Sequence, residues 1–130
     1  MTYLLDTSVL IDMKRGNPTI IRALRQLLGV SQTMPSITLF TYSEYYLGSI
    51  KEGKQVEAAD FLNQFAHLNF SLPSARLFSE LNYKYKIKGI VFDTLDLMNA
   101  SIAINEQLVF VTSDKFFNNL TELRKIIIPR

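Results

Sequence analysis

The sequence predicts one α/β domain, a three-layer α/β/α arrangement in which helices cover both faces of a central parallel sheet. Short apolar runs alternate along the chain with longer segments whose apolar residues recur at helical spacing. Such alternation is typical of a parallel sheet with helices on both faces. The chain has 130 residues, 48% of them hydrophobic and 20% charged, which favours a folded core over disorder. We therefore expect a single domain over residues 1–130.

Short runs rich in apolar and β-branched residues predict the strands. The clearest of them covers residues 108–112, where Val, Phe and Thr dominate. Residues 90–92 are expected to be extended. The predicted strands are residues 2–6, 34–38, 68–72, 108–112 and 125–128.

Helical spacing and capping signals predict the segments between the strands. Thr7 or Ser8 can cap the first helix, Pro73 suits a helix start, and Gly89 suits a helix end. The predicted helices are residues 8–14, 20–28, 39–51, 54–66, 73–88, 94–106 and 115–120.

Aspartates follow or precede several of the apolar runs. The first run ends on Asp6, the run at 108–112 leads into Asp114, and Asp96 starts a helix that feeds a strand. Parallel strands place their carboxyl ends along one edge of the sheet, so we expect these acids to lie near one another. Each acid also has a purely structural explanation as a helix cap, and Glu44 could be a solvated helix residue.

Several carboxylates at one edge would repel one another by about 4 kcal/mol per pair at 4 Å and an effective dielectric of 20. The acids therefore predict either a bound cation or a raised pKa. The chain has no cysteine and one histidine, His67, so the ligands are oxygens, which suit Mg²⁺ or Mn²⁺ better than Zn²⁺. Such an ion activates water and polarises phosphoryl oxygens, which favours phosphodiester hydrolysis. His67 is assigned no catalytic part.

Other classes fit the composition and motifs less well. Without cysteine there is no disulfide scaffold, thiolate zinc site or cysteine nucleophile, and no Walker A loop or glycine-rich dinucleotide turn is present. Aspartyl-phosphate phosphatases need a second aspartate where Ser8 stands. The net charge of +2 indicates no strong general affinity for nucleic acid. No signal peptide and no apolar run near the roughly 20 residues of a membrane span are found, so we expect a cytoplasmic protein without membrane contact.

Four blocks of the sequence resemble a known family. The opening block Tyr3–Asp12 strongly resembles the start of PIN domains, in particular the VapC-type toxins of type II toxin–antitoxin pairs. The blocks Glu44–Gly48, Asp96–Ala103 and Val109–Phe117 are similar to the later blocks of that family. One block alone is a weak signal, whereas four in order carry the resemblance over nearly the whole chain.

The resemblance implies a divalent-metal ribonuclease. Carried over residue by residue, the catalytic and metal-binding residues, with Mg²⁺ or Mn²⁺ as cofactor, are Asp6, Glu44, Asp96 and Asp114. The accessory residues are Ser8, Thr112, which would orient Asp114 or a metal-bound water, and Asn99, which stands where the family has small apolar residues and would contact water or substrate. Asp12 is expected to be structural and Asp93 a helix cap.

The resemblance also implies an RNA substrate, a small cognate antitoxin protein whose tail covers the groove, and a homodimer. Tyr42, Tyr45 and Tyr46 could stack on bases, although packing in the core or lining a partner groove is the simpler interpretation. Two alternatives stay open. One is a non-enzymatic PIN-like module that binds RNA or protein, and the other is a metal-dependent phosphomonoesterase.

Overall fold

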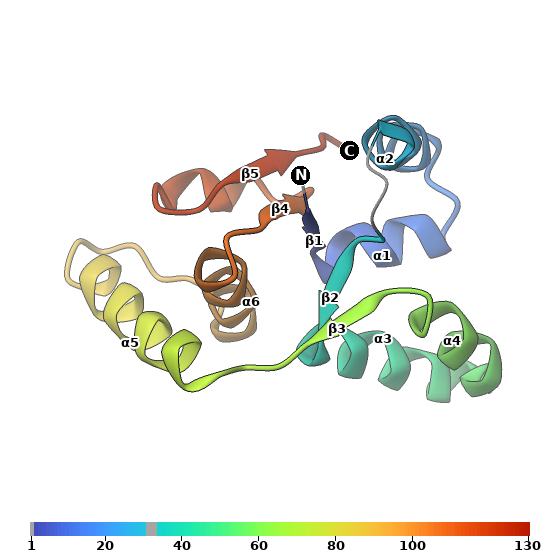
Figure 1. The fold of residues 1–130 in the computed structure, drawn as a ribbon, viewed down its shortest axis with the longest axis horizontal. Helices are drawn as coiled ribbons and strands as arrows, with labels where there is room; N and C mark the ends of the chain where they lie inside the picture. The colour runs from blue at the N-terminus through green and yellow to red at the C-terminus, as the bar shows by residue number, and fades with distance from the viewer. Residues whose placement is uncertain (1, 31–33) are drawn as a thin grey trace.

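The computed structural model describes residues 2–30 and 34–130, in which five parallel strands form one sheet in the order β3-β2-β1-β4-β5 (Figure 1). The strands are β1 (Tyr3–Leu5), β2 (Ser36–Thr38), β3 (Ala66–Leu68), β4 (Val109–Thr112) and β5 (Lys125–Ile127). The helices are α1 (Thr7–Lys14), α2 (Pro18–Val30), α3 (Leu39–Glu52), α4 (Gln55–Leu62), α5 (Leu72–Lys86) and α6 (Thr94–Asn105), and a 3₁₀ turn, η1, spans Lys115–Asn119.

Successive side chains of a strand point to opposite faces of the sheet, so the central strands contribute to two separate layers of the core. Tyr3 and Leu5 pack with the residues of α1 to α4, whereas Leu4 packs with those of α5, α6 and η1. Val111 and Phe110 divide in the same way on β4. Figure 1 shows the two sets of helices on opposite sides of the sheet. The three-layer α/β/α prediction is therefore confirmed.

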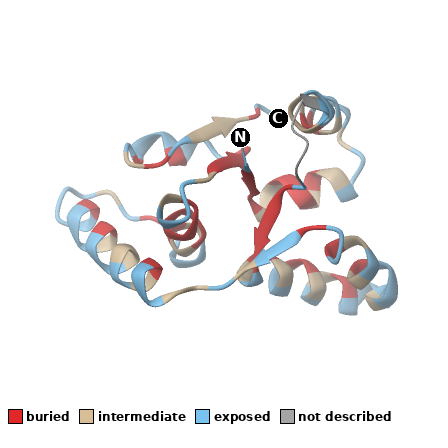
Figure 2. Ribbon diagram, viewed as in Figure 1, coloured by how far each residue is buried: buried red, intermediate tan, exposed pale blue. Residues whose placement is uncertain are grey.

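Burial is greatest in the three central strands, β2, β1 and β4 (Figure 2). The edge strands β3 and β5 are more exposed, since each has one neighbour in the sheet. All the strands are parallel, so the carboxyl ends of β1 and β4 lie at the same edge. This edge carries the predicted acids.

Most predicted elements are found within two or three residues of their expected ends, but one segment was misassigned. The helix predicted at 54–66 ends at Leu62, and the strand predicted at 68–72 lies instead at Ala66–Leu68, paired with β2. Leu72 already belongs to α5, because the hydroxyl of Ser71 accepts a hydrogen bond from the Ser74 N–H and caps that helix. Pairing with β2 therefore decides the structure of residues whose own apolar pattern favours a helix.

No helix in the described part of the chain combines the length and apolar character that crossing a lipid bilayer requires.

Candidate metal centre

Asp6 lies at the junction of β1 and α1, beside the neighbouring strand β4. The register pairs Leu5 with Val111, and the Asp6 N–H donates to the Val111 carbonyl oxygen at 2.9 Å. This pairing puts the Asp6 side chain against Thr112. The Thr112 hydroxyl donates to Asp6 Oδ2 at 2.7 Å and accepts the Asp114 N–H at 3.1 Å. One buried threonine therefore connects two of the predicted acids.

Three hydrogen-bond donors hold the Asp6 carboxylate in place. Besides Thr112, the Ser8 hydroxyl donates to Oδ2 at 3.0 Å, and the Thr7 N–H donates to Oδ1 at 2.9 Å. Asp6 is only 4% exposed, so its charge depends on these donors. It is also the N-cap of α1, which confirms the structural explanation given for this acid over the alternative caps Thr7 and Ser8.

Glu44 reaches the same region from the middle of α3. The Thr7 hydroxyl donates to Glu44 Oε1 at 3.0 Å and lies 2.8 Å from the hydroxyl of the buried Thr41. Thr7 therefore bridges the first helix to α3. Glu44 is exposed, which leaves its second oxygen open to the solvent side of the site.

Asp96 and Asp114 reach the site from the N-terminal ends of α6 and η1. Asp96 lies in the first turn of α6, where the Asp93 side chain caps the helix by accepting the Asp96 N–H at 3.1 Å. This confirms Asp93 as a helix cap. Asp114 is the N-cap of η1 and accepts the Phe116 N–H at 2.9 Å.

The four predicted acids line one pocket of about 540 Å³. Its other lining residues are Thr7, Ser8, Ile11, Ser113, Lys115 and Arg130. The four carboxylates come from four separate elements, so only the tertiary fold brings them together.

Burial, with smaller contributions from mutual repulsion, raises the pKa values of three of these acids. Burial raises the pKa of Asp6, although the hydroxyls of Thr112 and Ser8 and the Thr7 N–H oppose this. Partial loss of solvent raises the pKa of Glu44, with a smaller contribution from the Asp6 charge. Burial, followed by the charges of Asp6 and other nearby acids, raises the pKa of Asp96 to about 7. Holding all the acids ionised without a cation is therefore unfavourable.

The donor set fits a small hard cation with incomplete protein coordination. Within the described residues, no three acidic or imidazole side chains are close enough to form a ready metal cage. Mg²⁺ is commonly held by only one or two carboxylates and keeps several waters, so a complete cage is not required. Four oxygen-donor side chains around one pocket match that type of site.

Three other polar residues lie outside this pocket's lining. Asn99 is 1% exposed and accepts a hydrogen bond from Thr38, while its Nδ2 has no partner among the described residues, so the expected contact with water or substrate stays a prediction. His67 lies on β3 and bonds the Leu62 carbonyl oxygen. Asp12 is buried and bonds Arg130, in accord with a structural role.

Sequence reasoning did not find several residues that line the pocket. Thr7 and Ser113 flank predicted residues, so proximity to Asp6 and Asp114 was an available signal. Lys115 follows Asp114 directly. Arg130 had no local signal, because it reaches the pocket only after β5 has joined the sheet.

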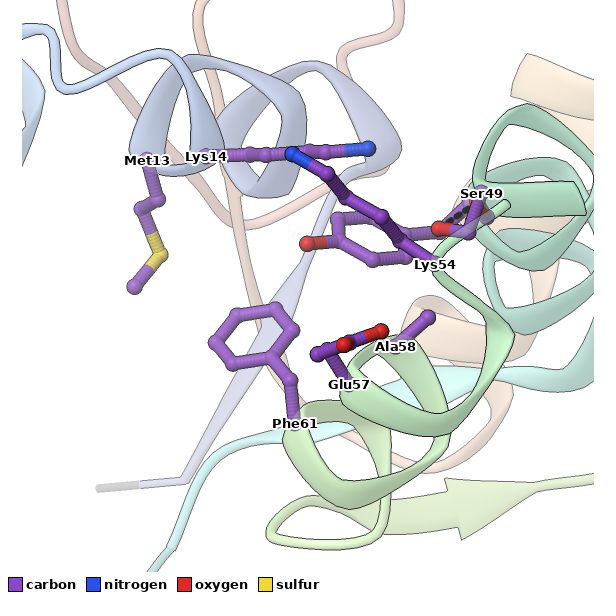
Figure 3. A pocket seen from close by; sticks show the side chains of 8 residues that line it. Met13, Lys14, Ser49, Lys54, Glu57, Ala58 and Phe61 are labelled. Atoms are coloured by element: carbon purple, nitrogen blue, oxygen red, sulfur yellow. Dashed lines mark hydrogen bonds between the residues drawn. The ribbon is translucent and has the colours of Figure 1, made fainter. Parts of the chain in front are cut away.

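A second cavity, of about 580 Å³, lies between α1, α3 and α4 (Figure 3). Met13 and Lys14 stand on one wall, and Ala58 and Phe61 stand on the wall facing them. Tyr45 lines this cavity, whereas the rings of Tyr42 and Tyr46 stack on each other 5.9 Å apart beside Glu44. The three tyrosines therefore pack against the fold, as the simpler interpretation expected.

Comparison with known proteins agrees with this geometry. Residues 3–123 match the profile of the PIN domain family, and the chain therefore belongs to that family.

Its relatives within the family include ribonucleases of the VapC type. Ribonuclease VapC3 of Methanocaldococcus jannaschii is 31% identical over 102 residues, which cover 78% of this chain and 98% of that protein. Ribonuclease VapC2 of Rickettsia felis is 28% identical over 130 residues, which cover 97% and 92% of the two chains.

Solved structures show the same fold. VapBC2 from Rickettsia felis, bound to a promoter DNA fragment, has a TM-score of 0.82 at 23% identity and covers 98% of both chains. VapBC-1 from nontypeable Haemophilus influenzae gives the same score, identity and coverage.

The raised pKa of Asp96 predicts a pH-dependent stability of the metal-free protein. In the unfolded chain Asp96 loses its proton near its ordinary pKa of 3.8, whereas in the folded chain it keeps the proton to about pH 7. The unfolded state therefore binds fewer protons in this window, and the free energy of unfolding falls as pH rises through it. We expect Asp96→Asn to stabilise the metal-free protein by about 1–2 kcal/mol at pH 8, after allowance for solvent screening, and by less at pH 5.

Urea unfolding in EDTA at the two pH values, followed by circular dichroism, measures this difference. The exposed Asp60→Asn on α4 is the matched control, and it should change the stability at neither pH. An Asp96→Asn gain of equal size at both pH values would contradict the prediction.

The Thr112 hydroxyl favours the ionised form of Asp6, so its removal should raise the pKa of that carboxyl further. We expect Thr112→Val to raise it, since the variant can no longer donate a hydrogen bond to the ionised carboxylate. NMR titration of the Asp6 carboxyl carbon measures the change. Thr112→Ser keeps the hydroxyl and should titrate like the wild type, and a Val variant that also does so would exclude this role for Thr112.

Proposed function

We propose that this protein is a divalent-metal-dependent endoribonuclease that hydrolyses RNA phosphodiester bonds and acts as the toxin of a toxin–antitoxin pair. The observation that carries the proposal is the meeting of four carboxylates, from β1, α3, α6 and the end of β4, in one pocket of a PIN fold. Relatives named as VapC ribonucleases support the same activity.

In this proposal Asp6, Glu44, Asp96 and Asp114 hold Mg²⁺ or Mn²⁺. A bound divalent cation supplies a Lewis acid that polarises the phosphoryl oxygens and stabilises the departing oxyanion. The raised pKa values support a site adapted to a positive partner, because a cation lowers the pKa of each acid that it contacts.

The protein's own contribution is to orient these groups before substrate arrives. Asp6 cannot rotate freely, since three donors bind its two oxygens. Thr112 fixes the backbone of Asp114 in the same network, and the Thr7 hydroxyl fixes Glu44. Such preorganisation reduces the reorganisation that the reaction would otherwise require.

A cognate antitoxin is the proposed regulator, and the VapBC complexes among the structural neighbours support it. The second cavity is a suitable place for an apolar segment of such a partner, with Met13 and Phe61 on its walls and Lys14 and Lys54 beside them (Figure 3). A homodimer is proposed as well. Leu39, Leu47 and Ile50 leave apolar surface exposed on α3, which either partner could cover.

Neutralising one central acid should remove the activity without unfolding the protein. We expect Asp6→Asn and Asp96→Asn each to lower the rate of RNA cleavage about 100-fold or more, because each removes a charged oxygen from the metal pocket. Sequencing of RNA ends after brief expression, and cleavage of the identified RNA by purified protein with Mg²⁺ or Mn²⁺, measure the effect.

The matched control is again Asp60→Asn, a carboxylate of the same type on the exposed face of α4. Its cleavage rate should equal that of the wild type. Full activity of both site variants would refute the assignment of these acids. Wild-type protein that binds RNA but neither binds millimolar Mn²⁺ in calorimetry nor cleaves any RNA would favour the non-enzymatic alternative.

The partner proposal predicts a second outcome in cells. Co-expression of a short reading frame encoded next to this one should relieve growth arrest and copurify with the protein. In its absence, light scattering after size exclusion should give twice the mass of one 14.9 kDa chain. A monomer at micromolar concentration would contradict the dimer alone, and arrest that no neighbouring frame relieves would contradict the antitoxin.

A further inference from the structure

A basic residue that follows the last strand lines the acidic pocket. Arg130 follows β5, at the same edge of the sheet as Asp6 and Asp114, and lines the acidic pocket with them. Figure 1 shows the chain leaving β5 toward α2. The metal-binding proposal gives no part to this side chain.

Arg130 is held by a buried carboxylate. Its Nε–H donates to Asp12 Oδ2 at 2.8 Å, and the Asp12 side chain is 8% exposed whereas that of Arg130 is 58% exposed. This bond fixes the plane of the guanidinium but uses only Nε. No further partner of this guanidinium is found among the described residues, so its Nη groups stay available on the exposed side.

Stability is a weak explanation for this pair. Only the carboxylate of this pair is buried, and an ion pair that takes one charge out of water while the other stays exposed to solvent adds little net stability. Asp12 sits on α1 between residues that pack into the core, where an apolar side chain would suit the packing. A buried acid at this place is better explained by the orientation that it imposes on Arg130.

Binding of RNA at this acidic pocket also requires a positively charged side chain. Four carboxylates repel a polyanion, and the lining offers only two basic residues, Arg130 and the exposed Lys115. The pocket lining also contains a hydroxyl group that is available to a ligand. Ser113 is 9% exposed, lines the same pocket, and its hydroxyl has no partner among the described residues. A buried hydroxyl of this kind is satisfied by water or by a bound group.

We propose that Arg130 binds a backbone phosphate of the RNA beside the acidic pocket, and that Asp12 is the positioning residue that orients it. The inference rests on the proposed ribonuclease function and adds a substrate contact to it. A planar guanidinium with free Nη donors suits the geometry of a phosphate. A backbone contact carries no sequence information, so Arg130 contributes affinity and register for any RNA.

Loss of this contact has a specific signature in RNA binding. We expect Arg130→Gln to weaken binding of a fluorescein-labelled random 20-nucleotide RNA about tenfold in EDTA, measured by anisotropy. The slope of log affinity against log salt should become shallower by about 0.7, the value for one phosphate contact on a single strand. In cleavage, KM should rise about tenfold while kcat stays within about twofold.

The chain offers a matched control at the other end of β5. Arg124 precedes β5 at the opposite edge of the sheet, is exposed, and lies outside the acidic pocket. Arg124→Gln removes the same charge and should leave the affinity, the salt slope and KM unchanged. Arg130→Lys keeps the charge but loses the planar guanidinium. Its RNA affinity and KM should lie between those of Arg130→Gln and the wild type.

A double-mutant cycle tests the part of Asp12. Asp12→Asn alone should raise KM severalfold, because Arg130 loses its anchor. In the Arg130→Gln background the same change should have no further effect on KM, since the residue through which Asp12 acts is gone. A merely structural pair would instead lower the melting temperature of each variant with an unchanged salt slope, and that result overturns the proposal.

The remaining outcomes separate this inference from the function on which it rests. Wild-type protein that binds and cleaves RNA, with Arg130→Gln identical to it in affinity and slope, overturns the inference alone. Wild-type protein that binds no RNA overturns both.

Discussion

The hydrogen bond between Thr112 and Asp6 is the contact on which the site depends. It exists because β1 and β4 are neighbours in the sheet although 106 positions separate the two residues. The same threonine accepts the Asp114 N–H, so the pairing of two central strands fixes two acids at once. Glu44 and Asp96 are then added from α3 and α6, which start at the same edge.

Three of these acids take part in helix capping and also line the candidate metal pocket. Asp6 caps α1, Asp114 caps η1, and Asp96 donates its N–H to the cap of its own helix. The positive ends of these short helices favour negative charge only modestly, by about 0.3–1 kcal/mol each. That is less than the repulsion among clustered carboxylates, which is why burial and charge raise the pKa of Asp96 despite its place at a helix start. A bound cation of the proposed kind would offset this repulsion.

Prediction from the sequence was most accurate for elements whose structure is determined by their own residues. The helices around 39–51 and 94–106 and the strand around 108–112 are confirmed because spacing, caps and β-branched residues agree. The helix predicted at 54–66 is found at Gln55–Leu62, and its C-terminal end was placed too late because Ala66 pairs with β2 as part of β3. The contact of Asn99 with Thr38 was likewise not accessible to local patterns, because the two residues lie 61 positions apart.

The order of residues was enough to indicate an α/β/α fold, because hydrophobic periodicity is a local property, and the resemblance to the PIN family singled out the four acids. Only the tertiary structure decided that these acids share one pocket, that Thr112 binds Asp6, and that Arg130 joins them from β5 through Asp12. These relations depend on strand order and on contacts across more than a hundred positions, which no local pattern contains. Their physical origin is the sheet, which brings separate carboxyl ends to one edge.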